Sequence, residues 1–271
     1  MELLTFEWRR ARSIRTTWIT SGFVVLGALF FAFLGTAAAV DENGQSLALP
    51  TTDLIKASLV DNPIVMVLIA SLGAMAFGHE YRYGTIRLTL TAFPRRTTVF
   101  FAKLVMTLLI ALAVAAVATA ITYAFLLATG ANEPGGLTWP RLVFQLVVFA
   151  VTFAVLAFSL TVITRNHPLG IIGPLLLFLF ELTIGGLLAE RLEWLPKALP
   201  LTAMQTWFGG DAGVRPIAVW AAWMVGLLAI LRMATAPPLA RDRLMGLAHV
   251  RKSLILALEG NEKSPPRLPE R

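Results

Sequence analysis

Long apolar stretches separated by short polar breaks dominate the chain. They fall at roughly residues 18–40, 61–79, 99–129, 141–163, 168–188 and 216–235. A helix needs about 20 residues to cross roughly 30 Å of hydrocarbon at 1.5 Å per residue. The pattern therefore predicts six membrane-spanning helices, the third of which is longer than one span requires.

The composition agrees with this pattern and excludes a soluble globular protein. Hydrophobic residues make up 57% of the 271 residues, charged residues make up 14%, and the mean hydropathy is +0.73. Soluble domains are less apolar and more highly charged. We expect an all-α integral membrane fold in three parts: an interfacial helix at 1–17, a six-span domain at 18–235, and a cytoplasmic basic amphipathic helix with a disordered tail at 236–271.

The segment before the first span has the pattern of an amphipathic helix. Its apolar side chains share one arc of a helical wheel, and Arg9, Arg10 and Arg12 lie away from that arc. Glu7 is the exception, because it falls within the apolar arc. The pattern favours a helix on the membrane surface, the alternative being a basic flank that only orients the first span. The apolar run that follows has span length, so we expect a retained span and not a cleaved signal peptide.

A second amphipathic pattern follows the last span, after the helix-breaking Pro237 and Pro238. Apolar residues recur there at helical spacing among basic ones: Leu244, Leu247, Leu254, Ile255 and Leu258. This predicts a basic helix that lies on anionic lipid or on a cytoplasmic partner. The residues from Gly260 onward are charged and rich in proline, which is typical of disorder.

Lysine and arginine are distributed unequally between the two sides of the predicted spans. One side holds only Lys56, Arg141, Arg191, Lys197 and Arg215, and the other side holds the remainder. Because cytoplasmic loops carry the excess of positive charge, both termini are predicted to be cytoplasmic. Orientation and attraction to anionic membrane lipid account for the net charge of +7, and we expect no nucleic-acid partner. The richness in Ala, Leu, Val and Arg suggests a high-GC bacterium, and we expect the chain to lie in a bacterial plasma membrane.

Metal and thiol chemistry are not indicated. The chain has no cysteine, and its three histidines, His79, His167 and His249, are too scattered to suggest a metal site. No Gly-x-x-x-x-Gly-Lys-Ser/Thr phosphate loop occurs in it. We therefore expect no metal and no cofactor bound by this chain itself.

The segment from His79 to Arg96, between the second and third predicted spans, is the most informative one. It contains four arginines, which would cost on the order of 10 kcal/mol in the middle of a bilayer. Gly84 permits a sharp turn, Thr85 can cap a short helix, and Pro94 would end it. These residues predict a two-turn amphipathic helix exposed to the cytosol. The alternative is an ordinary loop that sets the topology.

The same segment resembles the corresponding loop of ABC-2 type transporter permeases. The matching pattern is Glu80-x-x-x-Gly84-Thr85, followed by Thr89-Leu90-Thr91-x-x-Pro94-Arg95-Arg96 and then Lys103. The order of the other parts agrees: a basic helix before the first span, six spans, and a polar segment at 195–202 before the last span. The resemblance covers most of the chain.

The resemblance implies an exporter built from two permease and two ATP-binding cassette subunits, the permeases forming a homodimer or a heterodimer. It also implies that the first helix is a connecting helix, that residues 195–202 dip back into the outer leaflet, and that residues 86–91 form a coupling helix. The residues that it assigns to coupling with the ATPase are Glu80, Arg82, Gly84, Thr85, Ile86, Arg87, Leu88, Thr89, Leu90, Thr91, Pro94 and Arg95. ATP and Mg²⁺ would be used by the partner ATPase.

Glu181 is the one carboxylate well inside a predicted span, and such groups are often functional. It could line a substrate path, pair across helices, lie nearer the outer interface, or be hydrogen-bonded to a neighbouring helix. An intramembrane enzyme is disfavoured, because Glu181 stands alone and neither His-Glu-x-x-His nor Gly-x-Ser-x-Gly occurs. A secondary transporter or channel subunit without an ATPase partner is the alternative function, although inverted repeats and several intramembrane charges, which it would require, are weak or missing.

Overall fold

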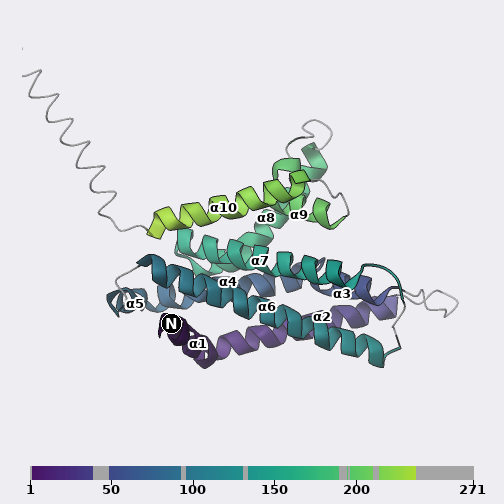
Figure 1. The fold of residues 1–271 in the computed structure, drawn as a ribbon, viewed down its shortest axis with the longest axis horizontal. Coiled ribbons are helices and arrows are strands. Elements are labelled where there is room, and N and C mark those ends of the chain that lie inside the picture. The colour runs from purple at the N-terminus through teal and green to yellow at the C-terminus, as the bar shows by residue number, and fades with distance from the viewer. Residues whose placement is uncertain are drawn as a thin grey trace, which may run out of the picture. The chain divides into compact units, whose positions relative to one another are not determined.

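The computed structural model describes residues 2–38, 49–92, 96–130, 134–188, 194, 196–209 and 214–235. Within them the chain is helical (Figure 1): α1 Glu2–Ser13, α2 Arg15–Ala38, α3 Thr51–Leu59, α4 Pro63–Tyr83, α5 Ile86–Ala92, α6 Arg96–Ala128, α7 Trp139–Thr164, α8 His167–Leu188, the 3₁₀ helix η1 Pro196–Ala198, α9 Pro200–Phe208 and α10 Val214–Thr235. The expected basic helix and tail at 236–271, together with Pro94 and Arg95, lie outside the described residues.

Six of the described helices are long and apolar enough to cross a membrane. Their spans are Arg15–Ala37, Pro63–Tyr83, Thr97–Ala128, Trp139–Thr164, His167–Ile184 and Val214–Arg232. The predicted all-α membrane class is thereby confirmed. The third span has 32 residues and would be about 48 Å long, so it extends past the hydrocarbon of a bilayer.

α4 and α7 form the centre of the helical bundle. α4 packs against α2, α6, α7 and α8, and α7 packs against α6 and α8 as well (Figure 1). The contact between α4 and α7 is close because Gly73 faces the backbone of α7, where a Cβ would collide with the carbonyl group of Ala154. Small residues allow membrane helices to approach in this way. α10 is linked to this centre by Trp220, whose Nε1 donates to Thr152 Oγ1 at 2.9 Å.

The loop between the second and third spans is shorter than predicted. α4 continues through His79 and Glu80 to Tyr83, and Gly84 then caps it at φ 66°, in the left-handed region. Glycine adopts this conformation without steric cost, so helices commonly end at it. Glu80 and Arg82 therefore belong to the end of a spanning helix and not to the loop.

α1 and α2 are separate helices that meet at a corner. α1 ends at Ser13 and α2 begins at Arg15, so residues 15–17, which were expected in the interfacial segment, form the start of α2. The indole Nε1 of Trp18 donates to the carbonyl oxygen of Arg12 at 2.9 Å and so bridges this corner. α1 packs against α6 as well as against α2.

Candidate functional site

The short helix α5 lies between the second and third spans, beside α4. Ile86 is partly buried and packs against the core, whereas Leu88 is 72% exposed. The backbone amide of Thr89 donates to the carbonyl oxygen of Thr85 at 3.2 Å, which closes the first turn of the helix. α5 thus presents an apolar side chain to its surroundings while its other face is attached to the bundle.

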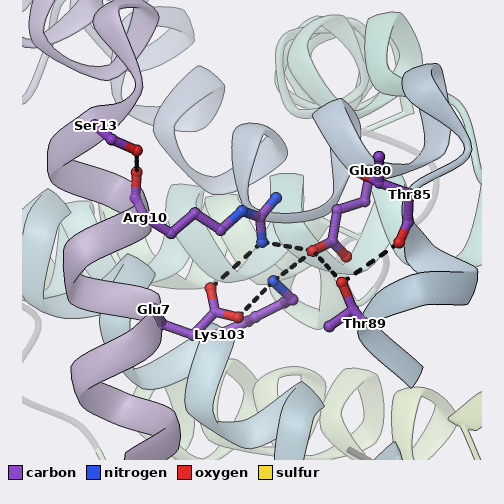
Figure 2. Close-up of polar contacts among 7 residues, drawn as sticks. All are labelled: Glu7, Arg10, Ser13, Glu80, Thr85, Thr89 and Lys103. Carbon is purple, nitrogen blue, oxygen red and sulfur yellow. Dashed lines mark hydrogen bonds and ion pairs between the residues drawn. The ribbon is translucent and has the colours of Figure 1, made fainter. Parts of the chain in front are cut away.

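The attachment centres on Glu80, whose side chain is almost fully buried. Its Oε1 accepts a hydrogen bond from Thr89 Oγ1 at 3.2 Å and ion pairs with Lys103 Nζ at 2.9 Å and Arg10 Nη1 at 2.6 Å (Figure 2). These three donors come from three different helices, namely α5, α6 and α1. One carboxylate oxygen therefore joins four elements, counting its own helix α4.

Glu7 completes the arrangement. Its Oε1 lies 2.8 Å from Lys103 Nζ, and its Oε2 lies 3.4 Å from Arg10 Nη1 (Figure 2). We call Glu7, Arg10, Glu80, Thr89 and Lys103 the Glu80 cluster. Its two carboxylates and two cations balance in formal charge, which is the condition under which charges are tolerated away from water.

The cluster packs against a group of three aromatic rings. The rings of Phe77, Phe100 and Phe158 pack against one another with centroids 5.0–6.1 Å apart. Lys103 is 1% exposed, and its Nζ lies 5.4 Å above the Phe77 ring. Because this environment is apolar, attraction between the charges is strong, and a charge that lost its partner would be expensive to keep buried.

This arrangement is suited to transmitting displacement. Ion pairs and hydrogen bonds that cross between helices hold those helices in register, so a shift of α5 changes the geometry at Glu80 and then at Lys103 and Arg10. In the part of the chain that the structure describes, no group of three His, Cys, Asp or Glu residues is placed to hold a metal ion.

Glu181 forms a second buried carboxylate site, at the N-terminus of α9. Its Oε2 accepts hydrogen bonds from the backbone amides of Leu201 and Thr202, at 3.0 and 2.8 Å, and from Thr202 Oγ1 at 3.1 Å. At the other end of α9, the carbonyl oxygen of Phe208 accepts from Arg141 and Gln145 on α7, both at 3.1 Å. A carboxylate at the start and a guanidinium at the end both complement the helix dipole. Of the readings left open for Glu181, the structure shows bonding to a neighbouring helix.

Residues 3–185 of the chain match the profile of the ABC-2 family transporter proteins. The chain belongs to the ABC-2 family. The predicted resemblance is therefore confirmed, and the protein is a multi-pass membrane permease subunit of an ABC transporter, which is not itself catalytic.

A second comparison matched only a short segment of this ABC-2 permease. The type II restriction enzyme SalI of Streptomyces albus G is 61% identical over 41 residues, which cover 15% of this chain and 13% of that enzyme. A segment of that length does not extend the enzyme's activity to the permease. No solved structure matches the chain significantly.

The structure brings several of the predicted coupling residues of the permease together and leaves others apart. Glu80, Gly84, Thr85 and Thr89 meet where α4 passes into α5, and Ile86 packs inward. Arg82 is exposed, with its guanidinium 5.8 Å from the centre of the Tyr83 ring. Arg87, Leu90 and Thr91 lie within α5 as expected, and nothing further is described of the first two side chains.

Sequence reasoning did not assign Glu7, Arg10 or Lys103 to the site. Arg10 was placed on the basic side of the first helix, and Lys103 was quoted at the end of the family pattern without a role in coupling. The signals were nevertheless present, because Glu7 falls on the apolar arc of its helix and Lys103 lies several residues inside α6. A charged residue on a face that must be buried calls for a partner of opposite charge.

Proposed function

We propose that this permease is the membrane subunit of an exporter that draws its energy from a separate ABC ATPase docked on α5. Two such permeases, identical or related, would enclose the substrate path, and the ATPase subunits would bind ATP and Mg²⁺. The observation that carries the proposal is the Thr89–Glu80 hydrogen bond, because it ties the exposed helix α5 to the ion pairs of Lys103 and Arg10.

The exposed position of Leu88 supports docking at α5. A large apolar side chain exposed on a short helix offers an anchor for a helix-in-groove contact. The absence of a phosphate loop from the 271 residues fits an energy source on another chain.

The mechanism follows from how the Glu80 cluster is built. Closure of two ATPase subunits on ATP would displace α5, and Thr89 would carry the displacement to Glu80 in α4. Lys103 and Arg10 would pass it to α6 and α1, so that three elements of the permease shift together. Such a shift favours one access state only because the cluster bonds differently in the two states.

The proposal also assigns the permease an orientation in the membrane. α5 and α1 would face the cytoplasm of a bacterial cell, with both termini on that side and α9 toward the outer leaflet. The excess of lysine and arginine in the segments at the α5 end supports this assignment.

Copurification tests the docking step directly. The tagged permease would be isolated from native membranes in mild detergent, together with any ATPase, as wild type and as Leu88→Ala. Truncation of an anchor residue in an interface costs about 2 kcal/mol or more, so we expect at least about tenfold weaker retention of the ATPase by Leu88→Ala. Leu187→Ala is the matched control. Leu187 is 74% exposed, but it lies at the C-terminal end of α8 and not on α5.

Two outcomes would contradict the proposal. Equal retention of the ATPase by both leucine variants would remove α5 as the docking site. A solitary permease that shows no ATPase in several gentle detergents would favour a channel or secondary transporter instead.

A further inference from the structure

An open apolar groove lies on the surface formed by α1, α2 and α6, outside the Glu80 cluster. Its volume is about 960 Å³, and its walls include Leu4 and Trp8 from α1, Trp18 and Gly22 from α2, and Leu109 from α6. Trp8, Trp18 and Leu109 are each more than half exposed. We expect a groove this apolar to face the membrane, because α2 and α6 are both long and apolar enough to span one.

Arg12 is the one ionisable residue among those that line the groove, and it lies at the end where α1 meets α2. Its backbone is held there by the bond from Trp18 Nε1 to its carbonyl oxygen. Indole rings are characteristic of the level of the lipid headgroups, and an arginine at that level attracts an anionic headgroup. The groove thus has a cationic, aromatic mouth and an apolar body.

The length of the groove identifies its occupant. On α6 its lining runs from Val105 to Val117, a rise of about 18 Å at 1.5 Å per residue. One leaflet contributes about half of the roughly 30 Å of hydrocarbon, or about 15 Å. The groove therefore matches the acyl region of one leaflet, whereas a helix from a second copy would need to continue through both leaflets.

We propose that this groove binds one anionic glycerophospholipid, with an acyl chain along α6 and the headgroup at Arg12. A small cavity of about 50 Å³ adjoins the groove, shares Ala11, Thr17, Met106 and Ile110 with it, and reaches Arg10 and Lys103. The bound chain would therefore pack against α1 next to the residues that carry its ion pairs. This inference does not depend on the ATPase partner.

Matched pairs of variants distinguish specific lipid binding in the groove from non-specific contact with the surrounding bilayer. Arg12→Gln removes the cation at the mouth, and Arg9→Gln is its control, since Arg9 is exposed on the same helix but does not line the groove. Gly22→Leu fills the groove, because a Cβ added at Gly22 meets nothing within 4 Å. Gly226→Leu is its control, since Gly226 on α10 has equally open surroundings.

The measurement is native mass spectrometry of the purified, delipidated permease after incubation with phosphatidylglycerol or phosphatidylcholine. We expect wild type to retain one phosphatidylglycerol in preference to phosphatidylcholine. Arg12→Gln should reduce that retention about fivefold, since one cation near an anionic headgroup contributes about 1 kcal/mol. Gly22→Leu should abolish it for either lipid, and both control variants should behave as wild type.

Three results would overturn the proposal. Undiminished lipid retention by Gly22→Leu would show that the lipid binds elsewhere. Equal retention of the two lipids by wild type would show that Arg12 does not select the anionic headgroup. The third is a disulfide between copies of Leu109→Cys in membranes, which is readily detected because the chain has no cysteine of its own. That disulfide would show that a second copy covers the groove.

Discussion

Two short helices of this permease, α5 and α9, each depend on a buried glutamate, but the two glutamates are balanced in different ways. Glu80 faces the cations of Lys103 and Arg10 and reaches α5 through the Thr89 hydroxyl. Glu181 faces the backbone amides of Leu201 and Thr202 at the start of α9. The Glu80 site joins α1, α4 and α6 by ion pairs and α5 by a hydroxyl group, and the Glu181 site holds one helix by the backbone amides at its N-terminus.

The consequence lies in how each short helix can move. α9 is bonded at both ends, by Glu181 at its N-terminus and by Arg141 and Gln145, which both donate to the carbonyl oxygen of Phe208. α5 carries the exposed Leu88 and bonds to the bundle through the hydroxyl of Thr89. A helix fastened at both ends is suited to a fixed position, whereas a helix on a side-chain tether is suited to transmit a displacement.

The largest expected effect comes from Lys103→Met, which leaves Glu7 and Glu80 buried with only Arg10 between them. Breaking a buried ion pair from one side costs about 3–5 kcal/mol, and we expect the free energy of unfolding in detergent to fall by that amount. Adding Glu7→Gln should recover part of the loss, because one uncompensated carboxylate is then removed.

Lys56→Met is the control for that variant. Lys56 pairs with the exposed Asp61 at 3.0 Å, so its replacement should cost about 1 kcal/mol or less. Equal losses for the two lysine variants would show that the cluster is not held by buried charge.

The same substitution at both glutamates sharpens the comparison. Glu181→Ala leaves three donors at the start of α9 without their acceptor, and we expect a loss of about 1–3 kcal/mol in the free energy of unfolding. Glu181→Gln should lose less, because an amide oxygen still accepts from the backbone amides. Glu80→Gln should lose more than Glu181→Gln, because it leaves Lys103 and Arg10 with a single carboxylate.

Hydrogen exchange locates these changes. Glu181→Ala should speed exchange at the amides of Leu201 and Thr202 and leave α5 unchanged. Faster exchange spread over the whole bundle would contradict a local role for Glu181.

The smallest effect on stability is expected from Thr89→Val, which removes the tether of α5 at a cost of about 1 kcal/mol. Its effect on coupling should be much larger, since the ATPase would still copurify while transport-linked ATP hydrolysis declined. Thr119→Val is the control, because the hydroxyl of Thr119 donates to Ala115 within its own helix α6. Unchanged coupling in Thr89→Val would mean that α5 acts on the bundle by another route.

Local pattern was enough to predict the spans and the helix α5. Six apolar runs of span length specify six helices, because the backbone in a membrane has to bond within its own segment. Gly84 marks the turn before α5 for an equally local reason, since it adopts φ 66°. The end of α4 was misplaced because polar residues such as His79 and Glu80 were taken as loop, although other helices cover them.

The sequence by itself determined the membrane class, the spans and the place of α5, since each depends on residues close together in the chain. Only the tertiary structure decided which charges meet. Glu7 and Lys103 are 96 positions apart, and Glu181 bonds to residues 20 and 21 positions later. Contacts of that kind depend on how whole helices pack, and packing is set by shape complementarity along the helices and not by any local motif.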